Sequence, residues 1–488
     1  MSSLHGNQMK VKDAKLFING EYINAVSGET FDTIDPSTNR KLASVANASE
    51  KDVKHAIEVA QRTFESGVWS EMPVEERSKI LCKMSDLVME RVNELALIET
   101  LDVGKPIKES REFDIPRAAS NLRFFAEMAK YIHQEHYQQS KHMSYTKYAA
   151  AGVTSLIIPW NLPFMQMTWK VSAALAAGNT VIVKPASYTP LSAVMLGEIA
   201  NEAGLPPGVL NIITGPGGTV GTAMSTNPYV RRISFVGETT TGQTVMKNAA
   251  SQLIPVSLEL GGKSANIVFE DADLDEAVKG SIEAIFRNQG EICLAGSRLL
   301  VQESIYDRFL EKFVNAVKKI KVGDPLDEAT DMGALVSRSH LEAVDNHVQV
   351  GMSEGAKLAI GGKRILGLGE GNFYEPTVLY DVDNKMKVAQ DEIFGPVLVV
   401  IPFKTEEEAV KIANDSIYGL AGVVWTNDLQ RAHRVASRVN SGLFWINCWY
   451  YRDLRTPFGG SKASGIGREG GRHSFEFYTE AKTITMKL

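Results

Sequence analysis

From about residue 150 onward, short apolar runs alternate with segments of helical periodicity, and this alternation restricts the fold more than any other feature of the chain. The first runs are VTSLII, NTVIVKP, GVLNIITG, RRISFVG and ANIVF, with helical segments such as SAVMLGEIANEAG and TGQTVMKNAA between them. Strands that are buried on both faces read as continuous apolar runs, and the helices between them return the chain to the same edge. The sequence therefore predicts an α/β protein built from βαβ units around a parallel sheet.

A second series of the same kind begins after residue 270. DADLDEAVKGSIEAIFRNQG and IYDRFLEKFVNAVKKIKVG have helical periodicity, whereas SRLLVQ, GPVLVVIPF, LAGVVWT and SGLFWINC are typical of strands. We therefore expect a second α/β unit. Before residue 150, LFINGEYIN (16–24) predicts a hairpin around its Asn-Gly pair, and 50–66 and 75–103 predict helices. Residues 144–151 and the final TITMKL are β-prone, and they can pair with each other or with another subunit.

Composition excludes several classes of protein. The 488 residues carry a net charge of −6, so no overall basic field attracts nucleic acid or an anionic membrane. Three scattered cysteines form neither a disulfide framework nor a zinc motif, and we expect no metal. The N-terminus lacks the apolar core of a signal peptide, and the apolar runs are far shorter than the roughly 20 residues that span a bilayer. We expect a cytoplasmic protein with free thiols.

The segment RNQGEICLAGSR (287–298) places Cys293 among small residues. A cysteine acts as a nucleophile when it is accessible and its pKa is lowered, for example by a helix N-terminus or a neighbouring cation. Gly290 and Gly296 would let a substrate carbon approach. A buried cysteine that only fills space is the alternative, since free cysteine is among the most buried residue types.

Two further segments carry groups suited to catalysis. Glu259 ends a strand-like run just before two glycines in SLELGGKSANIVF, and burial there would raise its pKa and make it a general base. Asn161 follows a strand in IIPWNLPFMQMTWK, where its amide can donate to an oxyanion. The alternatives are a carboxylate that caps nearby amides and an ordinary turn asparagine.

Two glycine-containing stretches, TGPGGTVG (214–221) and FVGETTTGQ (235–243), each follow a strand and lead into a helix. A helix N-terminus preceded by glycine favours a pyrophosphate, although neither stretch is a regular GxGxxG. Lys184 ends the strand VIVKPAS, in position for a ribose or a phosphate, or else it is a solvated surface lysine.

Together these segments resemble the aldehyde dehydrogenase superfamily over essentially the whole chain. The motifs that carry the resemblance are PWN (159–161), LELGGKS (258–264), the Cys293 segment, EIFGP (392–396) and PFGGSKASGIGRE (457–469), in the order of the family. The resemblance implies a Rossmann-type cofactor domain (1–127 and 150–261), an α/β catalytic domain (262–470) and a small β oligomerisation arm (128–149 and 471–488). It also implies a homodimer or homotetramer.

The family mechanism is implied with it. Cys293 would attack the aldehyde carbon, and Asn161 with the Cys293 backbone N–H would hold the oxyanion while hydride passes to NAD. Glu259 would activate the water that hydrolyses the thioester, and Glu469 matches a position proposed to pass that proton onward. Further contacts to the cofactor are expected from Ile158, Trp160, Lys184, Ser187, Gly217, Gly221, Phe235, Gly237, Glu238, Leu260, Glu392 and Phe394.

One position departs from the pattern. NAD-preferring relatives usually carry a glutamate three residues after the lysine, where this chain has Ser187. A carboxylate there would repel the 2′-phosphate of NADP and a serine would not. We expect NAD, with NADP possible.

The substrate class follows from two further segments, DIPRAASNLRFF (114–125) and NCWYYRDLRTPFGG (447–460). They resemble the branch that oxidises 2-aminomuconate and 2-hydroxymuconate semialdehydes. Arg117 and Arg452 match positions in the substrate tunnel, where guanidinium groups would grip a substrate carboxylate. The alternative is an ion pair with Asp114 or Asp453. Other expected substrate contacts are Arg455, Met165, Trp169 and Leu294, with Met165 and Trp169 equally compatible with an ordinary core position.

Three other functions are alternatives to this one. A broad-specificity or succinate-type semialdehyde dehydrogenase would use the same chemistry with a different pocket. A CoA-acylating relative is disfavoured by Glu259, because such enzymes typically lack the water-activating glutamate. A catalytically silent structural or ligand-binding member is disfavoured by the presence of Cys293, Glu259 and Asn161 together.

Overall fold

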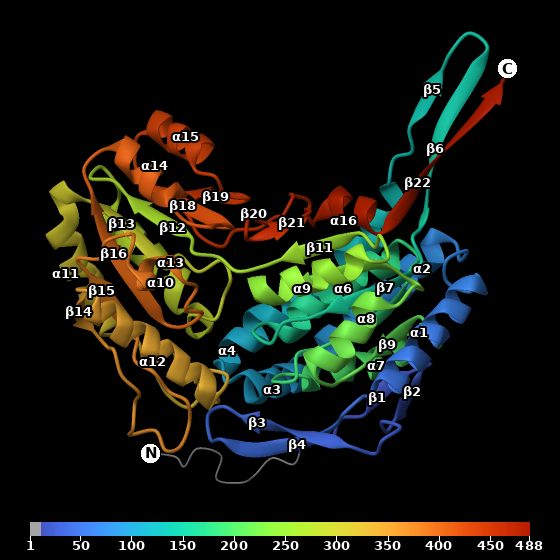
Figure 1. Ribbon diagram of the computed structural model, residues 1–488, viewed down its shortest axis with the longest axis horizontal. Coiled ribbons are helices and arrows are strands. Elements are labelled where there is room, and N and C mark those ends of the chain that lie inside the picture. The colour runs from blue at the N-terminus through green and yellow to red at the C-terminus, as the bar shows by residue number, and fades with distance from the viewer. Residues whose placement is uncertain (1–10) are drawn as a thin grey trace.

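The alternating segments form two large sheets side by side, with a narrow β-arm projecting from one end of the molecule (Figure 1). The computed structural model describes residues 11–488. Residues 1–10 lie outside the described residues. They belong to the N-terminal stretch for which the sequence predicts no signal peptide.

The first sheet has eight strands, of which the central five are parallel. In spatial order they are β2 (Glu21–Ile23), β1 (Leu16–Ile18), β9 (Leu210–Ile212), β8 (Thr180–Lys184), β7 (Val153–Ile157), β10 (Val230–Val236), β11 (Val256–Glu259) and β21 (Gly465–Ile466). The predicted hairpin is confirmed, with β1 and β2 antiparallel around Asn19 and Gly20. Both turn residues have positive φ (57° and 81°), which a type I′ turn requires and which Asn-Gly supplies.

Helices pack on both faces of this sheet, as the unbroken apolar strands predict. Along β8, Val181 and Val183 lie in one core and Ile182 lies in another on the opposite face. The helices around this sheet are α1 (Glu50–Glu65), α2 (Val74–Glu90), α3 (Val92–Val103), α5 (Ile115–Met128), α6 (Pro163–Ala176), α7 (Leu191–Ala203), α8 (Thr222–Thr226) and α9 (Thr239–Ala250). The one helix expected over 75–103 is two helices, α2 and α3. They part at Arg91, which forms ion pairs with Glu198 and Glu202 of α7.

The second sheet has seven strands, parallel except for β14 at one edge. In spatial order they are β14 (Lys357–Ile360), β15 (Thr377–Tyr380), β16 (Val397–Phe403), β13 (Arg298–Gln302), β12 (Ala265–Val268), β18 (Ala421–Trp425) and β19 (Leu443–Ile446). The accompanying helices are α10 (Leu274–Phe286), α11 (Tyr306–Val317), α12 (Arg338–Ser353), α13 (Lys387–Gln390), α14 (Glu406–Asn414) and α15 (Leu429–Arg438). Leu300 and Leu299 face different cores, so this sheet is also covered on both faces.

The arm consists of β22 (Thr479–Lys487), β6 (His142–Ala150) and β5 (His136–Gln138), in that order. The predicted β-prone ends pair with each other, since β6 and β22 are antiparallel over nine residue pairs from Thr479↔Ala150 to Lys487↔His142. Most of their side chains are exposed, and the arm extends away from the body with the C-terminus near its tip (Figure 1).

The chain returns from the second sheet to the first before it enters the arm. β21 pairs with β11, and α16 (Gly471–Phe477) contacts α6. Two short segments of the C-terminal region, 465–466 and 471–477, therefore pack with the first sheet, although the sequence grouped them with the catalytic domain and the arm. This crossing brings Glu469 into contact with α6.

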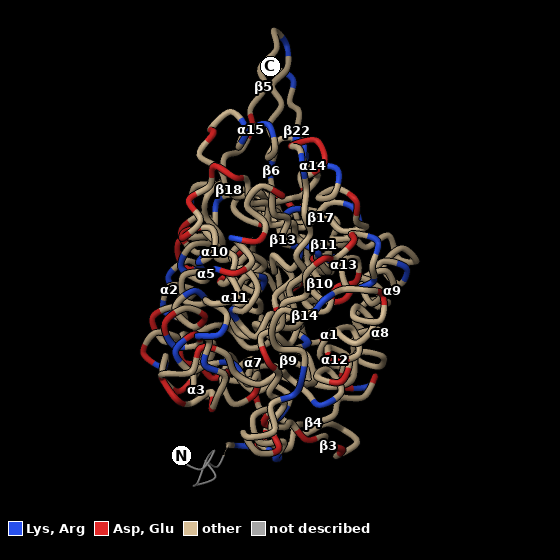
Figure 2. Tube along the Cα trace, turned by 90° about the vertical axis from the view of Figure 1, so that its left-hand side faces the viewer, with Lys and Arg blue, Asp and Glu red and all other residues tan. Residues whose placement is uncertain are grey.

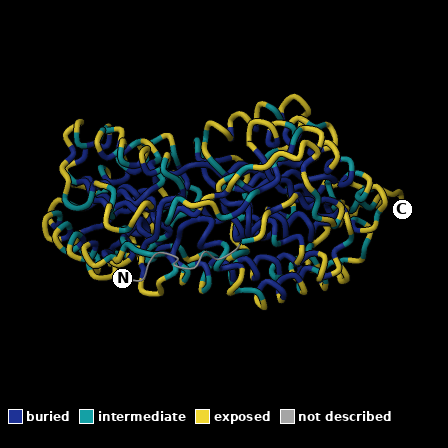
Figure 3. Tube along the Cα trace, turned by 90° about the horizontal axis from the view of Figure 1, so that it is seen from below, coloured by how far each residue is buried: buried dark blue, intermediate teal, exposed yellow. Residues whose placement is uncertain are grey.

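The two sheets form the buried interior, and exposed residues lie mainly on the outer helices and loops (Figure 3). Positive and negative residues are interspersed on the side seen in Figure 2, with no face of a single sign. No helix in residues 11–488 is long and apolar enough to cross a membrane, and no group of three or more possible metal-binding side chains occurs among them.

Candidate active site

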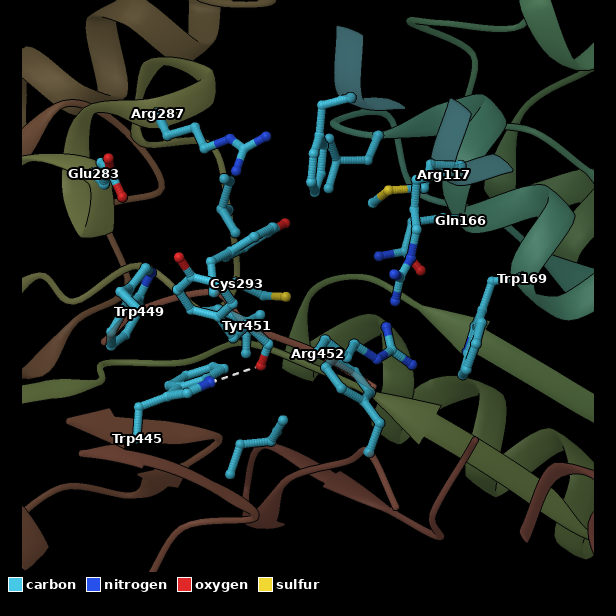
Figure 4. Close-up of a pocket in the computed structure, with 18 of the residues that line it drawn as sticks. Arg117, Gln166, Trp169, Glu283, Arg287, Cys293, Trp445, Trp449, Tyr451 and Arg452 are labelled. Atoms are coloured by element: carbon cyan, nitrogen blue, oxygen red, sulfur yellow. Dashed lines mark hydrogen bonds between the residues drawn. The ribbon is translucent and has the colours of Figure 1, made fainter. Parts of the chain in front are cut away.

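A cavity of about 370 Å³ lies where α5, α6 and the loop that follows β19 meet the segment between α10 and β13 (Figure 4). Of the three cysteines, only Cys293 is among the residues that line it. Its sulfur lies near the centre of the view, between Arg287 and the pair Arg117 and Arg452. The cavity therefore collects one thiol and three guanidinium groups.

The backbone before Cys293 follows a tight course. After α10, residues Arg287–Gly290 form a short 3₁₀ turn in which Asn288, Gln289 and Gly290 have positive φ. A side chain at Gly290 would overlap the backbone of Gly395, so glycine is required there for packing as well as for conformation. The turn presents Cys293 to the cavity from a loop that the second sheet supports.

The thiol environment differs from the expectation of a lowered pKa. Cys293 follows a helical turn and does not begin a helix, and no cation is among the groups that perturb it. Burial, with Glu392 and Glu259 nearby, raises the pKa of the Cys293 thiol to about 12. The backbone N–H groups of Leu294 and Cys293 oppose this shift. The thiol is therefore protonated at neutral pH in this structure.

Asn161 lies beside the Cys293 loop. Its Nδ2 donates to the carbonyl oxygen of Glu291 at 2.8 Å, and Asn288 donates to the carbonyl oxygens of both Asn161 and Glu291. An amide nitrogen carries two N–H donors, so Asn161 has a second donor for a bound group. The side chain is buried and held in place, as a preorganised oxyanion donor must be.

Glu259 is the last residue of β11 and is 4% exposed. Neither carboxylate oxygen accepts a hydrogen bond from any residue in 11–488. Burial first, and then repulsion by Glu469, raise the pKa of Glu259 well above its usual range, against the attraction of Lys170, Arg452 and Arg468. An unsatisfied carboxyl with a raised pKa suits a proton acceptor better than a cap.

Glu469 has the opposite environment. It accepts hydrogen bonds from Trp169 Nε1 at 2.7 Å, from Lys170 Nζ at 2.5 Å, and from the hydroxyls of Ser234 and Ser257 at 3.0 Å each. Burial raises the pKa of Glu469, but Lys170 and the other donors outweigh it, and the net shift is downward. Glu469 is thus a fixed anion that anchors α6 next to Glu259.

A second set of predicted residues lies at the carboxyl ends of β7, β8 and β10. Lys184 ends β8, is 4% exposed, and donates to the carbonyl oxygen of Pro185 at 3.0 Å. Burial lowers its pKa to about 8. Ser187 donates to the carbonyl oxygen of Gly215 at 3.1 Å. A buried lysine with unused donors fits the hydroxyl groups of a ribose.

The glycine stretches border the same edge. Added side chains at Gly217 and Gly221 would meet nothing within 4 Å, so this backbone is open to a ligand. Glu238 is the N-cap of α9, and Leu260 packs against Gly242 of that helix. Ile158, Phe235 and Gly237 lie at or just beyond the ends of β7 and β10. The open backbone at Gly217 and the N-terminus of α9 fit a dinucleotide diphosphate.

Glu392 and Phe394 connect this edge to the Cys293 side. Glu392 accepts the Gly262 N–H at 2.9 Å, and burial raises its pKa to about 7. The ring centroids of Trp160 and Phe394 are 5.1 Å apart. A side chain at Gly262 would overlap the carbonyl oxygen of Cys293, so the glycine that donates to Glu392 also packs against the backbone of the cysteine.

The two tunnel arginines are not in the ion pairs that the alternative interpretation required. Arg452 lies between the rings of Trp169 and Phe458, with its Cζ 3.9 Å from each centroid. Within the described chain its Nε and Nη2 have no hydrogen-bond partner. Burial, followed by repulsion from Arg117, lowers the pKa of Arg452 to about 10. Burial also lowers the pKa of Arg117.

The expected partners of these arginines are taken by other cations. Asp114 pairs with Lys105. Asp453 pairs with Arg455, and the distance from Arg455 Nη2 to Asp453 Oδ2 is 2.5 Å. Arg455 is largely exposed and is not among the residues that line the cavity, so the expectation that it contacts substrate is not met. That expectation for Arg455 was based only on its closeness to Arg452 in the sequence.

Met165, Trp169 and Leu294 all line the cavity, as expected of substrate contacts. The cavity is also lined by residues that the sequence patterns did not indicate, among them Phe113, Gln166, Arg287, Trp445, Trp449 and Tyr450. Arg287 and Tyr450 stand in the quoted segments RNQGEICLAGSR and NCWYYRDLRTPFGG. Their position in these two segments was the sequence feature that could have indicated a place in the cavity.

Comparison with known proteins agrees with this geometry. Residues 22–484 match the model of the aldehyde dehydrogenase family. The chain is 42% identical to 2-hydroxymuconic semialdehyde dehydrogenase of Pseudomonas sp. (strain CF600), over 98% of this chain and all of that protein. It is 44% identical to 2-aminomuconic semialdehyde dehydrogenase of Homo sapiens, over 96% of this chain and 97% of that protein.

Among solved structures, it is similar to indole-3-acetaldehyde dehydrogenase in complex with NAD⁺. The TM-score is 0.96 at 43% identity, and the match covers 98% of this chain and 97% of that one. The predicted fold class is therefore confirmed.

Proposed function

Because the chain belongs to the aldehyde dehydrogenase family, and is therefore an NAD(P)-dependent aldehyde dehydrogenase, we propose that its substrate is a semialdehyde that also bears a carboxylate. The substrate is of the 2-hydroxymuconate or 2-aminomuconate semialdehyde type, the class named for two of its relatives. The observation that carries this proposal is Arg452, a buried guanidinium in the Cys293 cavity with two nitrogens that no described residue satisfies.

A substrate carboxylate would offset the energetic cost of burying Arg452. A buried guanidinium with unsatisfied N–H donors is costly, and repulsion from Arg117 adds to that cost, against the attraction of Glu469 and Glu259. A substrate carboxylate would supply the missing acceptors, and a guanidinium can bind it through two parallel hydrogen bonds. A succinate-type semialdehyde is the second candidate, because it also carries a carboxylate.

In the proposed mechanism the Cys293 sulfur attacks the aldehyde carbon and forms a thiohemiacetal. Its thiol proton has to leave first, since the resting thiol is protonated, and it passes to solvent as the H⁺ that is released together with NADH. The developing oxyanion accepts hydrogen bonds from Asn161 Nδ2 and from the Cys293 backbone N–H. NAD, when bound, supplies the acceptor for the hydride, and the hemiacetal carbon becomes a thioester.

Glu259 then acts as the base. It takes a proton from the water that attacks the thioester carbonyl, and the product acid leaves as Cys293 recovers its proton. Glu469 keeps its charge and repels that of Glu259, which helps to keep the pKa of Glu259 high. Lys184 and Glu392 would hold the ribose hydroxyls of the cofactor, and Ser187 would leave room for NADP as well as NAD.

The organisation of the chain is proposed on the same basis. Residues 1–127 and 150–261 form the cofactor domain, and 262–470 form the catalytic domain. Residues 128–149 and 471–488, of which 471–477 pack against α6, supply the arm that joins a homodimer or homotetramer. A role of the arm in joining subunits is supported because β5 and β22 are both edge strands with largely exposed side chains.

Substitution of Arg452 tests the substrate class. Arg452→Met keeps an unbranched chain between Trp169 and Phe458 but removes the charge. We expect kcat/KM for a carboxylate-bearing semialdehyde to fall about 10- to 100-fold relative to an uncharged aldehyde of equal length, the range for a charged hydrogen bond. Arg452 also lowers the pKa of Glu259, so both substrates lose some rate and the ratio isolates the carboxylate contact.

Arg455→Met is the matched control, because Arg455 is in the same loop but outside the cavity. It should leave the ratio unchanged within about twofold, as expected for a surface pair. An equal loss for both substrates in Arg452→Met would assign Arg452 a structural role and would contradict the proposed substrate class.

A further inference from the structure

The catalytic cavity adjoins a second, more open groove of about 640 Å³ on the outer side of α10. Both hollows are lined by Phe113, Glu283 and Arg287, so these side chains stand between them. In Figure 4, Arg287 and Glu283 lie on the side of the cavity away from Trp169. A ligand that reached from Cys293 into the outer groove would have to pass this boundary.

Arg287 is fixed in the boundary from several directions. Its guanidinium Cζ lies 3.8 Å from the ring centroid of Phe113 and 4.9 Å from that of Tyr450. Its Nε donates to Glu109 Oε1 at 2.7 Å. The other oxygen of Glu109 accepts the Asn288 backbone N–H at 3.2 Å. Each of these contacts restricts the side chain, and together they hold it across the boundary.

Tyr450 completes the arrangement. Its ring centroid is 5.8 Å from that of Phe113, and its backbone has φ of 66°, a left-handed conformation that is unfavourable for an aromatic residue. In this conformation the ring lies against Arg287 and lines the cavity. We name the three side chains Phe113, Arg287 and Tyr450 the boundary stack.

The charge of Arg287 is already balanced, unlike that of the two tunnel arginines. Its partner Glu109 is within 2.7 Å, whereas Arg452 has nitrogens without partners among the described residues. Arg287 therefore serves as a wall and not as a binding group for a substrate anion.

We propose that the boundary stack determines substrate length, by excluding aldehydes whose chains would extend from Cys293 beyond the catalytic cavity into the outer groove. Arg287 is the specificity-determining residue, because it contacts both other members and lines both hollows. The inference rests on the proposed role of Cys293 as nucleophile, and it does not depend on a substrate carboxylate.

The test compares chain-length profiles in the full-length enzyme. kcat/KM with NAD is measured for straight-chain ω-oxo acids and for straight-chain alkanals, each with six and with ten carbons. Arg287→Ala joins the two hollows, and we expect the ratio of ten-carbon to six-carbon kcat/KM to rise about tenfold or more in both series. A ratio within a single variant is unaffected by a loss of folded enzyme, so a purely structural defect would not change it.

Two further variants make the test decisive. Lys319→Ala alters the outer groove alone and should leave the ratio of the parent enzyme unchanged. Glu109→Gln weakens the hold on Arg287 and should raise the ratio about threefold, which decides the matter if Arg287→Ala has no activity. Unchanged length profiles in the Arg287 and Glu109 variants would overturn the inference. Equal rates of the parent enzyme on oxo acids and alkanals would instead contradict the proposed substrate class.

Discussion

Cys293→Ala is expected to lower kcat for aldehyde oxidation by at least about a thousandfold, because removal of a covalent nucleophile leaves only binding and oxyanion stabilisation. Cys293 is the cysteine that lines the cavity, and Asn161 is held beside its loop. Alanine keeps the backbone of the loop and removes only the sulfur, which interacts with the backbone N–H groups of Leu294 and Cys293, so the variant should fold normally. NADH formation is followed at 340 nm, and NAD affinity is measured by titration calorimetry.

Cys448→Ala provides the control for this substitution. Cys448 is also partly buried and packs in the same hydrophobic core, but it does not line the cavity. Its loss should leave kcat within about twofold of the parent value, as for a small change in a partly buried side chain. A Cys293→Ala enzyme with substantial activity, or a large loss in Cys448→Ala, would require another nucleophile.

Glu259→Gln is expected to separate the two halves of the reaction. Glutamine has the same shape but cannot accept the proton of water, so the thioester should form and then persist. We expect a burst of about one NADH per active site, followed by steady turnover about 100- to 10,000-fold slower than in the parent, the range for loss of a general base. Rapid-mixing absorbance resolves the burst from the slow phase.

The pH dependence gives an independent measure of the same role. Burial and Glu469 raise the pKa of Glu259, so its carboxyl keeps a proton to higher pH than an exposed glutamate does. Only the deprotonated form accepts a proton, and hydrolysis of the thioester should therefore accelerate as pH rises through this pKa. That dependence should disappear in Glu259→Gln.

Glu283→Gln is the control for Glu259, since Glu283 lines the same cavity at the boundary with the outer groove. It should show neither the burst nor the slow phase. Unchanged turnover in Glu259→Gln, or a complete absence of NADH formation, would contradict the assignment of Glu259 to hydrolysis.

Local chemistry made much of the fold predictable. The unbroken apolar runs are the parallel strands of both sheets, and the Asn-Gly pair is the turn of the first hairpin. The break at Arg91 was not predictable, because no glycine or proline marks it. It coincides with ion pairs to residues more than 100 positions away. Tertiary contacts of that kind have no local sequence signal.

The candidate site also has features that the sequence predicted and features that depend on tertiary structure. Sequence order and motif spacing indicated Cys293, Glu259 and Asn161, and the structure brings Asn161 beside the Cys293 loop, with Glu259 in electrostatic range of the thiol. Sequence could not separate Arg452 from Arg455, which are three positions apart. One lies buried between two aromatic rings, and the other points outward to Asp453.

The electrostatic state of the site also depends on the fold. The raised pKa of the Cys293 thiol reflects burial and two carboxylates from distant parts of the chain. The partition between the cavity and the outer groove depends on Phe113, Arg287 and Tyr450, which come from three separate segments. No single motif contains that information.

The measurement that tests the central claim most directly is kcat/KM of the parent enzyme, with NAD, for 2-hydroxymuconate semialdehyde against an uncharged unsaturated aldehyde of similar length. If Arg452 and Arg117 bind a substrate carboxylate, the semialdehyde should be preferred about tenfold or more, which corresponds to about 1.4 kcal/mol of transition-state binding. Equal values for the two substrates would contradict the account and leave an aldehyde dehydrogenase whose buried arginines serve another purpose.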